Sequence, residues 1–131
     1  MYLLDTCAIS DLFSGIGKTQ ERVKTVSPSH IAISAVTTME VLYGFQLNGS
    51  AEKKFAAAFR ELCAATKVLP FDEQAASLAA RIRAELKERG TPIGPWDLLI
   101  AATAIANGCI LVTSNLREFN RIPDLAVEDW K

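Results

Sequence analysis

Three carboxylates lie in apolar stretches of the sequence, where folding alone gives little reason for a charge. Asp5 ends an apolar N-terminal run, Glu40 follows Thr37 by three residues, and Asp97 closes the segment 94–97. If one fold brings them together, their mutual repulsion must be balanced by cations, and Mg²⁺ or Mn²⁺ commonly balances clustered carboxylates. The three residues therefore predict metal-dependent phosphoryl transfer.

Each of these carboxylates also has a purely structural interpretation. A carboxylate at a strand end, such as Asp5, can cap the next helix. The pattern Thr37-x-x-Glu40 matches a capping box, in which the glutamate reaches back to the first backbone N–H of the helix. Asp97 can simply interact with the helix dipole, although a charge buried beside Trp96 would be costly unless paired or metal-bound. These patterns alone leave both interpretations open.

Short apolar runs that alternate with helical periodicity indicate the elements that position these residues. Asp72 is a good N-cap, Gly90 a good helix stop, and Pro95 suits the first turn of a helix that is apolar around most of its circumference. The expected strands cover residues 2–4, 30–34, 67–70, 109–113 and 126–127. The expected helices cover residues 6–13, 18–26, 37–47, 51–65, 73–89 and 95–106, and a turn region ends near 119.

Brief apolar strands that alternate with helices predict an α/β fold whose mostly parallel sheet is covered on both faces. In such sheets, ligands bind at the carboxyl ends of the strands. Asp97 is expected in the first turn of the helix that leads into strand 109–113, and the other polar candidates follow predicted strands. These candidates are Asp5, Thr6, Ser34, Thr37, Glu40, Thr113, Ser114, Asn115 and Glu118.

Composition limits the remaining function classes. The 131 residues are half hydrophobic and carry a formal net charge of −1, so one globular domain spanning 1–131 is expected, and any nucleic-acid binding must be local. Three widely spaced cysteines favour neither a disulfide framework nor a zinc site, and a reducing cytoplasm fits. No targeting segment and no apolar run long enough to span a membrane is visible.

Four segments, in this order, resemble the PIN-domain family and, more narrowly, the VapC toxins of bacterial type II toxin–antitoxin modules. The resemblance covers essentially the whole chain, and it rests on residues 3–6, 33–44, 92–102 and 111–119. It implies a three-layer α/β/α fold around a mostly parallel sheet, and an endoribonuclease that depends on Mg²⁺ or Mn²⁺. Structured RNA, tRNA above all, is the substrate class it implies, with 5′-phosphate and 3′-hydroxyl products.

Position by position, Asp5, Glu40 and Asp97 match the first three acidic residues of the family site, and the resemblance implies that they bind the metal. Many members have an aspartate at the fourth acidic position, where this chain offers Asn115 and then Glu118. The residues expected to orient water or phosphate are Thr6, Ser34, Thr113, Ser114 and Asn115. Cys7 stands where the family commonly has asparagine, and we interpret it as a small residue behind the metal ligands.

The resemblance also implies partners. A cognate VapB-type antitoxin is expected to cover the acidic pocket and to insert a basic side chain into it, and the toxin is expected to form a homodimer through apolar residues of the helices after strands two and three. One alternative is a catalytically inactive PIN-like binding module. Phosphotransfer receivers fit less well, because they usually have an additional acidic pair and a lysine after a late strand. Haloacid-dehalogenase-like phosphatases also fit less well, because they require an aspartate where Cys7 stands. The basic run Arg81, Arg83, Lys87 and Arg89 alternates with glutamates and so favours a solvated helix face; a phosphate contact for one or two of its members is the less favoured alternative.

Overall fold

The computed structural model describes all 131 residues and contains a single five-stranded sheet in which every pair of neighbours is parallel. The strand order is β3-β2-β1-β4-β5, so the chain builds outward from β1 on one side and then returns to build the other. The strands are β1 (Tyr2–Leu4), β2 (Ile31–Ser34), β3 (Lys67–Leu69), β4 (Ile110–Val112) and β5 (Val127–Glu128). The sheet therefore reverses its direction of growth between β1 and β4, where ligands of α/β proteins bind.

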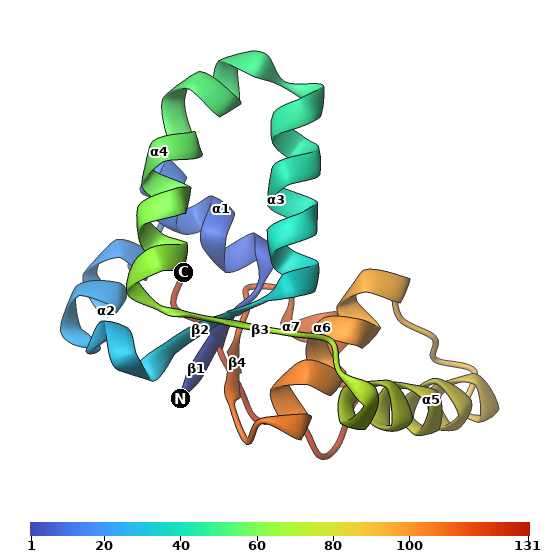
Figure 1. Cartoon of the computed structure of the whole chain (residues 1–131). Coiled ribbons are helices and arrows are strands. Elements are labelled where there is room, and N and C mark those ends of the chain that lie inside the picture. Colours follow the sequence, from blue (N-terminus) through green and yellow to red (C-terminus); the bar gives the residue numbers. More distant parts are fainter.

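Helices cover both faces of this sheet (Figure 1). They are α1 (Thr6–Ser14), α2 (Thr19–Thr25), α3 (Ala35–Leu47), α4 (Gly49–Ala65), α5 (Glu73–Glu88), α6 (Pro95–Ala106) and α7 (Leu116–Phe119). Two hydrophobic cores result, one between the sheet and α5, α6 and α7, and one between the sheet and α1 and α4. Successive β1 residues divide between them, since Leu3 packs in the first core and Leu4 in the second. The expected three-layer α/β/α architecture is confirmed.

The sequence patterns predicted most boundaries to within two residues. Asp72 caps α5 by accepting a hydrogen bond from the Ala75 N–H at 2.9 Å, and Pro95 is the first residue of α6. Helix α3 begins at Ala35, two residues earlier than expected, because Ser34 is its cap. The last strand is shifted by one residue, and the expected turn before Phe119 is the short helix α7.

Helices α3 and α4 stand side by side and project from the end of the sheet where the strands finish (Figure 1). Asn48 ends α3 and also caps α4, accepting hydrogen bonds from two backbone N–H groups of that helix. No helix in the protein is both long enough and apolar enough to cross a lipid bilayer. The projecting pair forms one wall above the carboxyl ends of β1 and β2.

Candidate active site

Asp5 lies directly after β1 and is almost fully buried, with 2% of its surface exposed. Its Oδ1 accepts a hydrogen bond from the Ala8 N–H at 2.7 Å, so it caps α1 as the structural interpretation predicted. The Thr113 hydroxyl, at the end of neighbouring β4, also hydrogen-bonds the Asp5 side chain. Capping uses only part of the carboxylate, and its remaining acceptor capacity is available to other partners.

Glu40 joins this group from α3, and its capping-box interpretation is wrong. Thr6 Oγ1 donates to Glu40 Oε1 at 2.6 Å across 34 positions of sequence. The cap of α3 is Ser34, whose Oγ accepts from the Thr37 N–H at 3.0 Å. Because the helix begins at Ala35, Thr37 lies inside its first turn and leaves Glu40 no capping role. Glu40 is thus held across the site by the residue that follows Asp5.

Asp97 and Glu118 meet on either side of Gly94. The Gly94 N–H donates to Glu118 Oε1 at 2.5 Å, and Asn115 Nδ2 donates to Glu118 Oε2 at 2.9 Å. A Cβ at Gly94 would lie 3.4 Å from Glu118 Oε1 and 3.7 Å from Asp97 Oδ2. The missing side chain therefore lets the backbone approach both carboxyl groups. Glu118, and not Asn115, brings the fourth carboxylate to the site.

The electrostatics show that these carboxylates are crowded. Burial, with smaller contributions from Asp11 and Glu40, raises the pKa of Asp5 to about 6. Burial and the neighbouring Glu118 raise the pKa of Asp97 to about 7. Burial alone would raise the pKa of Glu118, but hydrogen bonds from Gly94, Asp97 and Asn115 outweigh it and lower that pKa. Of this pair, Asp97 is therefore the group that holds a proton up to near-neutral pH, and Glu118 is the one that stays ionised.

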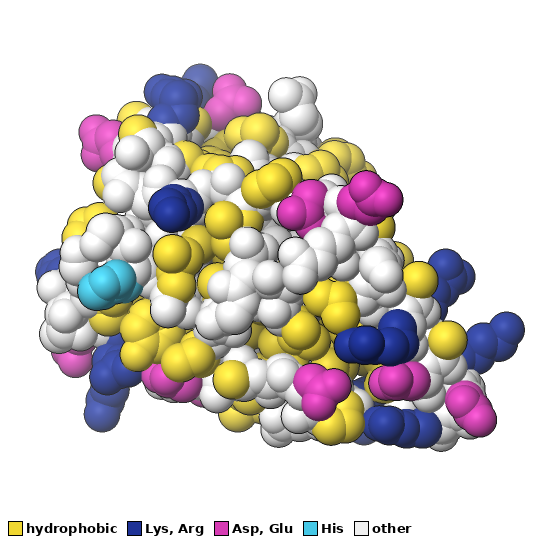
Figure 2. Space-filling model, turned by 60° about the horizontal axis from the view of Figure 1, so that its bottom comes forward, with side chains coloured by type: hydrophobic (Ala, Val, Ile, Leu, Met, Phe, Trp, Pro, Cys, Tyr) yellow, Lys and Arg dark blue, Asp and Glu magenta, His cyan; other side chains and the backbone are white.

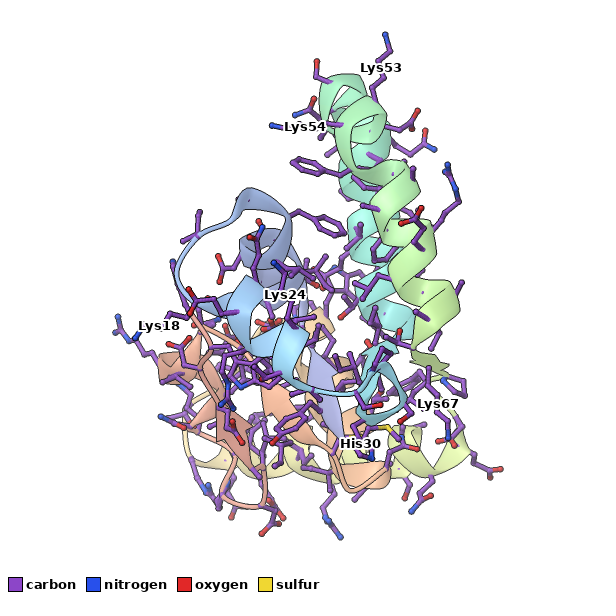
Figure 3. All side chains as sticks on the ribbon, turned by 90° about the vertical axis from the view of Figure 1, so that its left-hand side faces the viewer. Lys18, Lys24, His30, Lys53, Lys54 and Lys67 are labelled. Carbon is purple, nitrogen blue, oxygen red and sulfur yellow. The ribbon has the colours of Figure 1, made fainter.

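No basic side chain forms an ion pair with this cluster, although the charge of Arg121 helps to lower the pKa of Glu118. The protein has one ion pair, between Arg22 and Glu128 at 3.2 Å, and neither residue belongs to the site. Figure 3 shows Lys53 and Lys54 at the far tip of the α3–α4 pair and Lys67 at the β3 edge. His30 precedes β2, so it lies at the amino end of the sheet, opposite the carboxylates. The charge of the cluster is left for an exogenous cation.

The donor set suits a hard divalent cation. Four carboxylates supply only oxygen ligands, which Mg²⁺ and Mn²⁺ prefer over nitrogen or sulfur. No three of the acidic side chains already stand close enough to form a coordination shell by themselves. Partial burial and the surrounding carboxylates raise the pKa of the Cys7 thiol to about 11, so Cys7 stays neutral and does not add a thiolate. The residues present fit Mg²⁺ or Mn²⁺.

The remaining polar candidates divide into two groups. Thr6 and Thr113 contact the carboxylates directly, and Thr113 Oγ1 also accepts from the Asn115 N–H at 3.0 Å. Ser34 is fully buried, and its hydroxyl is engaged in capping α3. Ser114 is half-buried beside Thr113. The roles of all five candidates in orienting water or phosphate remain predictions: Thr6, Ser34, Thr113, Ser114 and Asn115.

Three contributors were not anticipated from the sequence. Asp11 is buried in α1, and its charge raises the pKa of Asp5. Gly94 provides the close backbone approach described above. Arg121 Nη1 donates to the Pro92 carbonyl at 2.7 Å and fixes the loop before α6. Of the three, only Asp11 could have been found from the sequence, because it is an acidic residue about one helical turn after Cys7 in the predicted helix that follows Asp5.

Comparison with known proteins identifies this arrangement. The PIN domain family matches residues 2–125. The chain belongs to the PIN-domain family. It is 42% identical over 105 residues to the tRNA(fMet)-specific endonuclease VapC of Salmonella typhimurium, which covers 80% of this chain and 79% of that protein. It is also 33% identical over 132 residues to the ribonuclease VapC1 of Haemophilus influenzae strain R2866, across 99% of this chain and 98% of that protein.

Among solved structures, the chain is similar to DNA-bound VapBC from Salmonella typhimurium. The TM-score is 0.88 at 36% identity, over 99% of this chain and 98% of that one. Within the PIN-domain family the chain therefore groups with the VapC ribonucleases. The PIN-like fold and the family expected from the sequence are both confirmed.

Proposed function

We propose that this protein is the toxin endoribonuclease of a VapBC module and hydrolyses RNA phosphodiester bonds with Mg²⁺ or Mn²⁺. One observation carries the proposal: carboxylates from four separate segments converge at the switch point of a parallel sheet, and no basic side chain pairs with them. Such a site is costly to keep unless it binds cations. The named VapC relatives supply the reaction class.

Each residue has a distinct part in this reaction. Asp5 and Asp97 would hold the cation directly, and Glu40 would bind it directly or through water. A bound divalent ion lowers the pKa of the attacking water and stabilises charge on the phosphate. Glu118 is oriented by Gly94 and Asn115 beside Asp97, where its carboxylate can accept a proton from the reacting water. Thr6 holds Glu40, and Thr113 holds Asp5.

The proposed substrate is a structured RNA in the cytoplasm, with tRNA as the first candidate because one relative is a tRNA(fMet)-specific endonuclease. The test is to incubate the purified protein with total RNA and Mg²⁺ or Mn²⁺, and then to map the ends. We expect discrete cleavage that leaves 5′-phosphate and 3′-hydroxyl ends and that stops when the metal is chelated. A protein that binds RNA but cleaves none with either metal would instead be the inactive PIN-like module.

A VapB-type antitoxin is the proposed inhibitor, because several similar solved structures are VapBC complexes. A cleft of about 280 Å³ between α1, α3 and α4 starts at Thr6 and Glu40 and continues along apolar side chains that include Phe13, Phe45 and Phe55. An antitoxin segment in this cleft can place an arginine or lysine among the carboxylates. Inhibition should then weaken as Mn²⁺ is raised, whereas a bound antitoxin that leaves cleavage unchanged at every Mn²⁺ concentration would contradict this arrangement.

Homodimerisation is proposed through α3. Its exposed large apolar residues fall mostly one turn apart and lie away from the cleft: Met39, Leu42, Tyr43 and Leu47. The apolar residues of α5 were the other expected contacts, but Ala75, Ala79, Ile82 and Leu86 are buried within the protein's own core. Light scattering should show a dimer that Tyr43→Glu converts to a monomer, and an unchanged mass would exclude this face.

A further inference from the structure

The acidic site presents a problem for an RNA substrate, because its carboxylates and the phosphate backbone repel each other. The net charge of −1 gives no general attraction, so cations close to the site must hold the RNA. A cleft of about 500 Å³ lies between the second half of α5, the loop before α6 and the start of α6. It is lined by Arg83, Leu86, Lys87, Pro92, Ile93, Pro95, Leu98 and Leu99.

Two unpaired cations line this cleft. Arg83 and Lys87 are one turn apart on the same side of α5, whereas Glu85 lies on the opposite side of that helix. Both basic residues are exposed, and neither forms an ion pair within the protein. In Figure 2 several dark blue Lys and Arg side chains lie at the end of the molecule formed by α5, interspersed with magenta Asp and Glu side chains. Exposed, unpaired cations over an apolar floor can bind phosphate groups whose sugars and bases contact that floor.

The cleft shares a wall with the acidic cluster. Pro92, Ile93 and Pro95 line the cleft, and Gly94 between them donates its N–H to Glu118 in the active site. The hydrogen bond from Arg121 to the Pro92 carbonyl fixes this wall. The distance along the chain between the cleft and the catalytic carboxylates is therefore two residues, from Pro95 to Asp97.

In the first turn of α6, Trp96 stands between Pro95, which lines the cleft, and the carboxylate residue Asp97. Its side chain is 49% exposed, although its neighbours Leu98 and Ile100 are buried. An exposed indole at this point offers a flat face on which a nucleobase can stack, and such stacking tolerates any base. Arginine, lysine and an exposed aromatic beside a nucleolytic site form the combination that proteins use to hold single-stranded nucleic acid.

We propose that Arg83, Lys87 and Trp96 hold the single-stranded RNA segment next to the scissile phosphate: the base beside that phosphate stacks on Trp96, and the neighbouring phosphates bind Arg83 and Lys87 in the α5–α6 cleft. This inference rests on the proposed ribonuclease function and deepens it. It makes these three side chains positioning residues, since the chemistry itself takes place at the carboxylates.

The kinetic test compares two charge-matched double variants of the full chain on bulk tRNA with Mn²⁺. Arg83→Gln/Lys87→Gln removes the cleft cations, and Arg81→Gln/Arg89→Gln removes two exposed cations of the same basic run that do not line the cleft. We expect the cleft pair to raise KM about tenfold or more with kcat within about twofold, and to reduce the salt slope of RNA binding by about 1.4, the value for two single-strand phosphate contacts. The control pair should leave both quantities near those of the parent.

The stacking test uses Trp96. Trp96→Ala should weaken binding of a fluorescein-labelled single-stranded RNA about tenfold or more in an Asp97→Asn background that cannot cleave it, while Trp96→Phe should retain most of the affinity. Circular dichroism and thermal melts confirm that each variant is folded. Equal effects of Ala and Phe, or equal KM values for the cleft and control pairs, would overturn the proposal.

Two further outcomes separate this inference from others. If the cleft pair loses co-purification with the antitoxin while its KM for tRNA is unchanged, the cleft is a protein-binding surface and the RNA proposal is wrong. If the parent protein cleaves no RNA under any metal condition, the proposed ribonuclease function fails instead. Cleavage by the parent with unchanged KM in the cleft pair contradicts only the present inference.

Discussion

Asp5 and Asp72 cap the amino ends of α1 and α5 in the same way, but the two aspartates differ in burial and in the charges around them. Asp5 and Asp72 each accept a hydrogen bond from the backbone N–H three residues later, at 2.7 and 2.9 Å. Asp72 is exposed at the rim of the sheet, whereas Asp5 is buried among other carboxylates, and burial raises its pKa to about 6. A capping role therefore does not exclude a catalytic one, and the environment of the carboxylate decides between them.

The largest expected difference is in RNA cleavage. Asp5→Asn and Asp97→Asn should each lower kcat/KM by more than about a hundredfold, because even residues behind a metal ligand are worth 10- to 100-fold. Asp72→Asn, which also keeps a good cap, should stay within about twofold of the parent. The measurement is cleavage of bulk tRNA with Mn²⁺ by all three variants, after melts have shown them to be folded. Comparable losses in Asp5→Asn and Asp72→Asn would show that Asp5, like Asp72, only caps its helix.

A smaller loss is expected at Glu40. Glu40→Gln keeps the hydrogen bond from Thr6 but removes a charge that binds the cation, so cleavage should fall at least about tenfold, which is 1.4 kcal/mol in the barrier. Its free energy of unfolding should be unchanged, because Ser34 and not Glu40 caps α3. Glu52→Gln, in the exposed first turn of α4, is the matched control. Full activity in Glu40→Gln would assign Glu40 a structural role.

The two caps should also differ in their effects on stability without metal. Asp5→Asn relieves desolvation and repulsion while keeping the cap, so it should raise the free energy of unfolding by about 1–2 kcal/mol at pH 7. Asp72→Ala loses a cap and relieves neither desolvation nor repulsion, so it should lower the free energy of unfolding by about 1 kcal/mol. Urea denaturation in the presence of a chelator measures both. Destabilisation by Asp5→Asn would show that the charged form of Asp5 is favourable in the fold.

The smallest effect is the pH dependence of stability. Asp5 and Asp97 have folded-state pKa values of about 6 and 7, above the value of 3.8 for a free aspartate, so the folded protein binds more protons than the unfolded chain between about pH 4 and 7. Stability of the metal-free protein should therefore fall as pH rises through this window. Asp5→Asn should flatten the slope, and Asp72→Asn should leave it as it is in the parent. A stability that rises across this window would contradict the raised pKa values.

Much of the fold was predictable because its signals are local. Asp72, Gly90 and Pro95 mark helix ends through their own backbone chemistry, and the apolar runs at Leu3 and Leu111 mark strands that are buried on both faces. The start of α3 was misplaced because two candidate caps, Ser34 and Thr37, stand three residues apart. Only the packed structure shows which of them has its oxygen near an unpaired N–H.

The site was predictable in its residue types but not in its contacts. Asp5, Glu40 and Asp97 were recognisable as carboxylates in apolar sequence, and Glu118 as one option for a fourth. The bond from Thr6 to Glu40 and the approach of Gly94 to Glu118 join segments 34 and 24 residues apart, so no local pattern contains them. The same limit hid the cleft beside Trp96, which depends on how α5 packs on α6.

Whether the acidic cluster binds a divalent cation is tested by a calorimetric titration of the metal-free protein with Mn²⁺ at pH 7.

We expect stoichiometric binding by the parent and by Asp72→Asn, and an affinity lower by at least about a hundredfold in Asp97→Asn. Binding should also release protons, because the cation displaces those held by Asp5 and Asp97. A parent protein that binds no Mn²⁺, or an Asp97→Asn variant that binds it as tightly as the parent, would contradict the assignment of this cluster as a metal-dependent nuclease site.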